Sequence, residues 1–143
     1  DRLEIIPSEV DLCGADLELA RIENHLYRVK LALQPVIDSG RFDLIVIDCS
    51  FISLRKILPP AVALLRTPGR IVALIKPQFE AGKAEVDKGA GVITDPAIHE
   101  RVLGELAAFV AAATSLQWCG VTESPLLGPA GNKEFLVLIE KNG

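Results

Sequence analysis

Apolar residues in this chain fall into short blocks whose spacing predicts alternating strands and helices. Between residues 15 and 37, apolar side chains recur every three to four positions, as on one face of a helix. The run 42–48 (FDLIVID) is apolar at nearly every position, as in a parallel strand covered on both faces. Further strands are predicted at 3–6, 69–76, 116–123 and 135–140, and further helices at 53–65 and 95–115.

Proline and glycine modify this pattern at three places. Pro59 and Pro60 fall inside the helix at 53–65 and are predicted to kink or split it. Residues 77–94 contain several glycines and many charges, which predicts a long and functional loop. Asp95 followed by Pro96 is a preferred way to begin a helix.

The predicted order of elements is β-α-β-α-β-α-β-β. Alternating strands and helices indicate a single α/β domain over residues 1–143, built as a three-layer α/β/α fold. The sheet is predicted to be mostly parallel and Rossmann-like. Its last two strands have no helix between them, so they should pair antiparallel, which makes the final strand antiparallel.

Composition excludes several classes of protein. Half of the residues are hydrophobic and 24% are charged, which argues against disorder. No apolar run approaches the roughly 18 residues that span a bilayer, and the net charge of -4 argues against a general nucleic-acid coat. The three cysteines form no CxxC pair, so neither a metal site nor a disulfide framework is expected. With no visible export leader, we expect a reduced, cytoplasmic chain without membrane partners.

Three polar residues lie beside predicted strand ends. Asp48 and Lys76 end two buried strands, and Glu134 precedes the last strand. Because ligands of open α/β sheets bind at the carboxyl ends of the strands, these side chains could converge on one site. A lysine between carboxylates is normally protonated, and it serves as a base only where burial or another cation favours its neutral form. Taken singly, each residue is as readily a turn cap, a solvated charge or an edge charge. His25 and His99 have no partner at ligand spacing and are predicted to be surface residues.

Three motifs bear a specific resemblance. The segments 48–54 (DCSFISL), 76–80 (KPQFE) and 131–135 (GNKEF) resemble the hemolysin A (TlyA) and FtsJ-like rRNA methyltransferases, in order and in spacing. The resemblance covers residues 41–143, the C-terminal half of such a domain. It implies transfer of a methyl group from S-adenosylmethionine to a ribose 2′-hydroxyl of ribosomal RNA. It also implies a Lys-Asp-Lys-Glu tetrad, whose last three members would be Asp48, Lys76 and Glu134.

The same resemblance implies binding residues. Asp48, Ser50 and Phe51 would contact the cofactor, and Phe79, Glu80, Lys83 and Asn132 would contact the RNA. The family's glycine-rich cofactor loop has no counterpart, because no G-x-G cluster precedes residue 40. We therefore expect the isolated chain to bind the cofactor poorly and to be inactive or nearly so.

Residues 1–48 resemble a second family, the ParA/Soj-type partitioning ATPases, in which Asp48 would be the Walker B aspartate. The continuation expected of that family fails at Ser50 and Phe51 (CSF in place of CPP), and no phosphate-binding loop is present. One interpretation is a chimera joined in the shared strand at 42–48. The rival hypotheses are a ParA-like nucleotide-binding fragment and a recombined α/β domain without catalytic function. Either could form a homodimer that covers exposed apolar surface.

Overall fold

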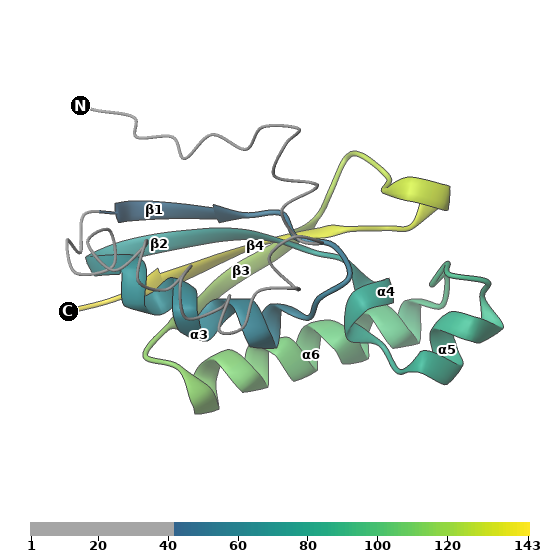
Figure 1. Ribbon diagram of the computed structural model, residues 1–143, viewed down its shortest axis with the longest axis horizontal. Helices are drawn as coiled ribbons and strands as arrows, with labels where there is room; N and C mark the ends of the chain where they lie inside the picture. Colours follow the sequence, from purple (N-terminus) through teal and green to yellow (C-terminus); the bar gives the residue numbers. More distant parts are fainter. Residues whose placement is uncertain (1–41) are drawn as a thin grey trace, which may run out of the picture. The chain divides into compact units, whose positions relative to one another are not determined.

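The computed structural model describes residues 42–143 (Figure 1). The strand and helix expected at 3–6 and 15–37 lie outside these residues. In chain order the elements are β1 (Phe42–Ile47), α3 (Leu54–Leu64), β2 (Leu65–Ile75), α4 (Pro77–Glu80), α5 (Lys83–Lys88), α6 (Pro96–Ala113), β3 (Gln117–Glu123), a 3-10 turn (Pro129–Gly131) and β4 (Phe135–Lys141).

The four described strands form one sheet in the order β1-β2-β4-β3. β1 and β2 are parallel, whereas β4 is antiparallel to both β2 and β3. The antiparallel pairing of the last two strands is confirmed. The expectation of a mostly parallel sheet is wrong for this part of the chain. The reason is that the β3–β4 hairpin folds back so that β4 lies between β2 and β3, which makes two of the three pairings antiparallel.

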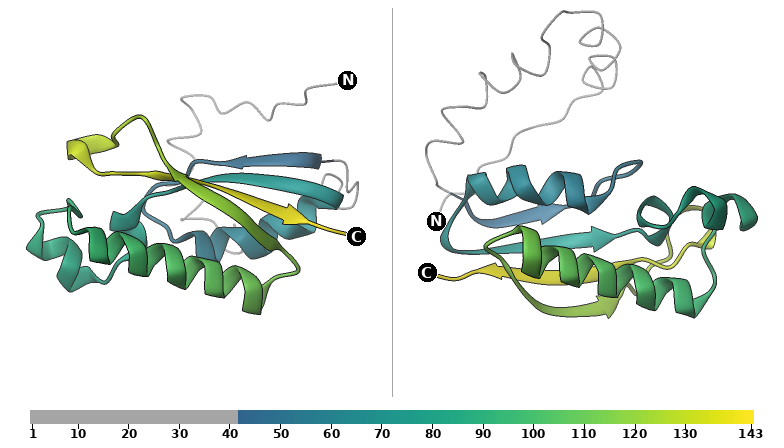
Figure 2. Two further views of the ribbon diagram at one scale, coloured as in Figure 1. Left: turned by 180° about the vertical axis from the view of Figure 1, so that it is seen from behind. Right: turned by 90° about the horizontal axis from the view of Figure 1, so that it is seen from below.

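Both long helices of the described part cover the same face of the sheet. The three views agree that α3 and α6 lie side by side on that face (Figures 1 and 2). Residues 42–143 therefore form two layers, and the three-layer arrangement is not seen within them. The core between these layers is aliphatic and includes Leu58, Ile71, Leu106, Val110, Val137 and Ile139. On the other face of the sheet Leu44 and Val46 are exposed.

The proline pair does not divide the helix that contains it. α3 runs unbroken through Pro59 and Pro60, so the expected split is wrong. Leu54, Leu58 and Ala61 are buried and anchor the helix both before and after the prolines. This packing offsets the two hydrogen bonds that the prolines cannot donate.

Residues 77–94 contain two short helices rather than the expected continuous loop. α4 begins with Pro77, a position where a missing N–H costs nothing. At the start of α5, the Gly82 N–H donates to the Glu85 carboxylate at 3.0 Å, which caps that helix. The helix predicted after Asp95 is confirmed as α6, with the Asp95 side chain accepting from the Ala97 N–H at 2.9 Å. Within residues 42–143, no helix has the length and apolar character to cross a membrane.

Candidate active site

The carboxyl ends of the parallel pair β1 and β2 bring two predicted site residues together. Asp48 follows β1 and Lys76 follows β2, and the lysine Nζ lies 2.6 Å from Asp48 Oδ1. The same ammonium donates to Ser50 Oγ at 3.1 Å. The Lys76 side chain is only 11% exposed, whereas that of Asp48 is 64% exposed. The lysine is thus largely buried beneath a carboxylate that solvent and ligands can reach.

Glu134 lies on the neighbouring strand at the same edge of the sheet. Ile75 pairs with Phe135 in the β2–β4 ladder, so one further step places Glu134 opposite Lys76. Glu134 is 7% exposed, and its Oε1 atom is buried without a hydrogen-bond partner. Gly128 lies against this carboxyl, because a Cβ atom at Gly128 would be 2.2 Å from Oε1. A buried carboxylate oxygen without a donor is unusual and is suited to a donor from a ligand.

A cavity of about 550 Å³ opens beside Lys76. The rings of Phe51 and Phe79 stand at its rim with centroids 4.9 Å apart and a tilt of 48°. Phe51 is 89% exposed and has a φ of 62°, a strained value for a bulky residue. The lining residues are Ser50, Phe51, Lys76, Gln78, Phe79, Val86, Ala90, Gly91, Ala130 and Asn132.

The remaining predicted substrate contacts are differently placed. The Glu80 carboxylate accepts from the Ser53 hydroxyl at 2.6 Å and from the Leu54 N–H at 2.7 Å, at the N-terminus of α3. Asn132 lines the cavity, but its amide spans the loop before α6: Oδ1 accepts from the Ile93 N–H at 2.9 Å, and Nδ2 donates to the Gly91 carbonyl at 3.0 Å. Lys83 is exposed at the start of α5 and is not among the lining residues.

Two residues near the site were not predicted to belong to it. His99 is buried, so the prediction of a surface histidine is wrong. Its Nε2 lies 2.9 Å from the Ile93 carbonyl, and its ring meets Phe135 edge-on at 5.4 Å. The signal was available, because His99 precedes Val102 and Leu106 at helical spacing on the buried face of α6. Gln78 lines the cavity, and its Oε1 is buried without a hydrogen-bond partner.

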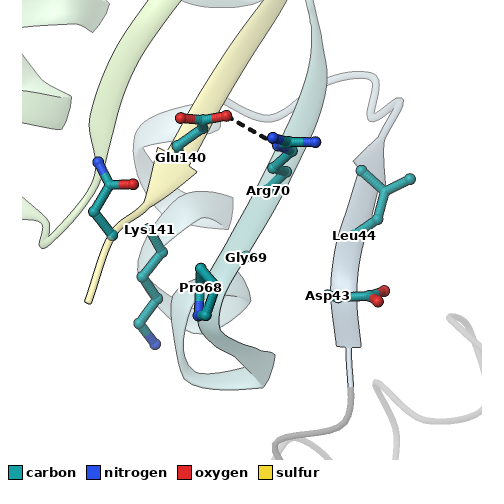
Figure 3. Close-up of a pocket in the computed structure, with 8 residues that line it drawn as sticks. Asp43, Leu44, Pro68, Gly69, Arg70, Glu140 and Lys141 are labelled. Carbon is teal, nitrogen blue, oxygen red and sulfur yellow. Dashed lines mark hydrogen bonds and ion pairs between the residues drawn. The ribbon is translucent and has the colours of Figure 1, made fainter.

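A second cavity, of about 500 Å³, lies at the opposite end of the sheet, at the start of β1 (Figure 3). Its charged side chains already have partners: Arg70 pairs with Glu140 at 2.9 Å and Asp43 with Arg66 at 3.1 Å. Lys141 donates to two carbonyls at the end of α3. These contacts support the fold, so we assign the site to the Lys76 edge. No group of three potential metal ligands occurs among residues 42–143.

Comparison with known proteins identifies the family of this chain. The model of the FtsJ-like methyltransferase family matches residues 8–141. The 16S/23S rRNA (cytidine-2′-O)-methyltransferase TlyA of Mycobacterium tuberculosis is 44% identical over 107 residues, covering 73% of this chain and 38% of that protein. Hemolysin A of Brachyspira hyodysenteriae is 40% identical over 97 residues, covering 64% and 38%.

Other matches are shorter or structural. The chromosome partitioning protein ParA of Myxococcus xanthus is 35% identical over 63 residues, covering 44% of this chain and 18% of that protein. A crystal structure of a Lactococcus lactis protein assigned as a hemolysin has a TM-score of 0.66 and 44% identity, covering 71% of this chain and 47% of that one. The chain thus spans well under half the length of the curated relatives it matches. Because the family model covers nearly all of its residues, the chain belongs to the FtsJ-like methyltransferase family.

Proposed function

We propose that this chain carries the catalytic edge of an S-adenosylmethionine-dependent methyltransferase acting on a ribose 2′-hydroxyl of ribosomal RNA. The observation that carries the proposal is the buried Lys76, paired with Asp48 at 2.6 Å and opposite Glu134 in register. A hydroxyl that becomes methylated must lose its proton, and a positioned base lowers the barrier for that loss. The relative TlyA is named for 2′-O-methylation of cytidine in rRNA, which is consistent with this chemistry.

The roles of the three residues follow from their positions. Lys76 faces the cavity; after its ammonium has released a proton to solvent, the neutral amine would accept the proton of the 2′-hydroxyl. Asp48 and Ser50 bind its Nζ and would orient it. Glu134 lies opposite Lys76 in register and does not line the cavity, so it would help to orient the lysine rather than contact the ribose. Since RNA is distinguished from DNA by this hydroxyl, the site would select RNA.

The described residues can form part of a cofactor site. S-adenosylmethionine, when bound, supplies the methyl group. The exposed Asp48 carboxylate, the Ser50 hydroxyl and the Phe51 ring would contact it. The sequence before residue 40 contains no glycine cluster for the methionine end of the cofactor. We therefore propose that residues 1–143 alone bind the cofactor weakly and turn over slowly or not at all.

RNA would enter beside the aromatic rim. The Phe79 ring, with Phe51 beside it, presents apolar faces on which an unstacked base could stack. Lys83 is exposed on α5, where it could meet a phosphate. Glu80 and Asn132 are bonded within the protein, so their contribution to RNA binding would be to hold the walls of the cavity.

The test is methyl transfer from radiolabelled S-adenosylmethionine to ribosomal subunits that lack the modification. We expect slow transfer that is abolished by Lys76→Met and unaffected by Lys133→Met, a control lysine paired with Glu123 at an exposed position. Transfer that survives Lys76→Met would contradict the catalytic role. Calorimetry tests the cofactor separately, because micromolar binding of S-adenosylmethionine would contradict the expected weak binding.

A ParA-like nucleotide-binding fragment is the second candidate, favoured by the 63-residue match to ParA. A helix N-terminus is the usual place for a nucleotide phosphate. At α3 that position is already taken by the Glu80 carboxylate, which would repel an anion. We therefore expect no binding of ATP by calorimetry. Measurable binding would favour this candidate, and the sequence of the parent gene would test the chimeric origin.

A homodimer and a cytoplasmic location remain predictions. Leu44 and Val46 are exposed on the sheet face that α3 and α6 leave uncovered, and such aliphatic side chains favour self-association. Sedimentation analysis of the chain would decide whether it is a dimer.

A further inference from the structure

Two segments that follow the parallel strands are joined along their whole length. Residues 48–54 follow β1 and residues 76–80 follow β2; we call them the paired segments. Contacts join them in sequence order: Asp48 with Lys76 at 2.6 Å, Ser50 with Lys76 at 3.1 Å, the Phe51 ring with the Phe79 ring at 4.9 Å, and Ser53 and Leu54 with Glu80 at 2.6 and 2.7 Å.

Glu80 makes the last of these contacts and uses both carboxylate oxygens. It is the final residue of α4, and it caps the 11-residue helix α3, which starts 26 residues earlier in the chain. Hydrogen bonds to a carboxylate are stronger than neutral ones, and the positive end of the α3 dipole adds to them. This contact therefore ties the end of one segment firmly to the end of the other.

The segment 48–54 needs such an anchor. It carries both residues that bind the Lys76 ammonium, and these two residues, Asp48 and Ser50, are exposed. Phe51 between Ser50 and Ser53 has a φ of 62°, which this type of residue adopts only when its surroundings impose it. The segment is held at one end by β1 and at the other by Glu80.

We propose that Glu80 is a positioning residue, which holds segment 48–54 against Lys76 and so fixes the direction of the lysine ammonium. The inference rests on the proposed function in one respect only, namely that Lys76 is the base. Glu80 itself accepts hydrogen bonds from Ser53 and Leu54, and it is not among the residues that line the cavity. Its effect would pass through Ser53, Phe51 and Ser50.

The experiment measures how readily each lysine reacts with N-acetoxysuccinimide, by peptide mass spectrometry across a range of pH. In Glu80→Ala, we expect the labelling rate of Lys76 to rise about tenfold and its pH profile to change. Tenfold corresponds to about 1.4 kcal/mol. Glu80→Gln can still accept from the Leu54 N–H, so it should restore most of the protection. The labelling of Lys133 should stay constant in every variant.

Asp95→Ala is the matched control, because it removes a carboxylate that caps α6 and is not part of the paired segments. It should lower the melting temperature while leaving the labelling of Lys76 unchanged. If Glu80→Ala behaves in the same way, Glu80 is only a helix cap and the proposal is overturned.

If Glu80→Ala does not fold, Ser53→Ala takes its place. It removes one of the two donors to Glu80, and unchanged labelling of Lys76 in that variant would also overturn the proposal. The assay uses neither cofactor nor RNA, so a failure of methyl transfer does not affect its outcome.

Discussion

Asn132 offers a test of how the cavity wall is held in place. Its amide connects the loop before β4 to the loop before α6, with Oδ1 accepting from the Ile93 N–H and Nδ2 donating to the Gly91 carbonyl. Asn132 is only 3% exposed. Because a backbone N–H can only donate and a carbonyl can only accept, these partners fix which end of the amide is oxygen. Asn132→Asp keeps the shape of the side chain and removes one donor.

The size of the effect follows from this geometry. At neutral pH the new carboxylate keeps the bond to Ile93 but turns its second oxygen toward the Gly91 carbonyl. Losing that hydrogen bond costs about 1 kcal/mol, and burying the charge beside an acceptor adds about 2 kcal/mol or more. A total of about 3 kcal/mol raises the pKa of the new carboxyl from about 3.9 to about 6. A protonated carboxyl can donate to Gly91 again, so the raised pKa means that the stability is fully present below about 3.9 and is lost as pH rises from there through about 6.

Urea denaturation followed by circular dichroism between pH 4.5 and 8 measures this effect. The variant should fall behind the parent by about 1 kcal/mol at pH 4.5 and by about 3 kcal/mol at pH 8. Asn142→Asp is the matched control, because Asn142 donates to Gln117 at an exposed position and the change should alter stability by less than about 0.5 kcal/mol. A deficit for Asn132→Asp that is independent of pH, or no deficit, would refute the inferred role of the amide.

One substitution and one titration test other parts of the structure. Gly128→Ala would place a Cβ atom 2.2 Å from Glu134 Oε1, so we expect a loss of about 1–3 kcal/mol in urea unfolding that disappears in a Glu134→Ala background. The pKa of Glu105 is lowered by hydrogen bonds from Arg101 and then Arg55, so the stabilisation it provides is present above its ordinary value of 4.5 and is lost as pH falls through the lowered value. NMR titration of the Glu105 carboxyl carbon should give a midpoint below 4.5, and a midpoint at or above 4.5 would contradict the observed pairing.

Local signals in the sequence were sufficient for most elements of the described part. The apolar block at 42–48 predicted the position of β1, but the expected burial of both faces is wrong, because Leu44 and Val46 are exposed. The Asp95-Pro96 pair predicted the start of α6, because helix capping depends on neighbouring residues. The motif residues Asp48 and Lys76 lie together as their strand-end positions suggested. A parallel pair places its carboxyl ends at one edge by geometry alone, so this contact required no knowledge of the remaining topology.

Features that depend on distant contacts were not predictable. Nothing in the β3–β4 hairpin sequence shows that β4 lies between β2 and β3. This placement makes two of the three strand pairings antiparallel. The proline pair of α3 is tolerated because the helix has buried residues both before the prolines (Leu54 and Leu58) and after them (Ala61). The Glu80 carboxylate caps a helix 26 residues away, and no pattern within KPQFE indicates that partner. Long-range packing overrode the local preference in each case.

Buried polar side chains in this structure differ in whether their atoms have hydrogen-bond partners. This difference separates residues that support the fold from residues suited to chemistry. Glu80 and Asn132 have their polar atoms bonded within the protein, as structural residues do. Among residues 42–143, three buried side-chain atoms lack a hydrogen-bond partner, and two of them, in Gln78 and Glu134, belong to the Lys76 edge of the sheet. Each such atom costs about 1–3 kcal/mol, which folding alone gives no reason to retain. Because local inconsistencies of this kind concentrate at functional sites, the unpartnered oxygens of Gln78 and Glu134 support the proposed placement of the site at the Lys76 edge of the sheet.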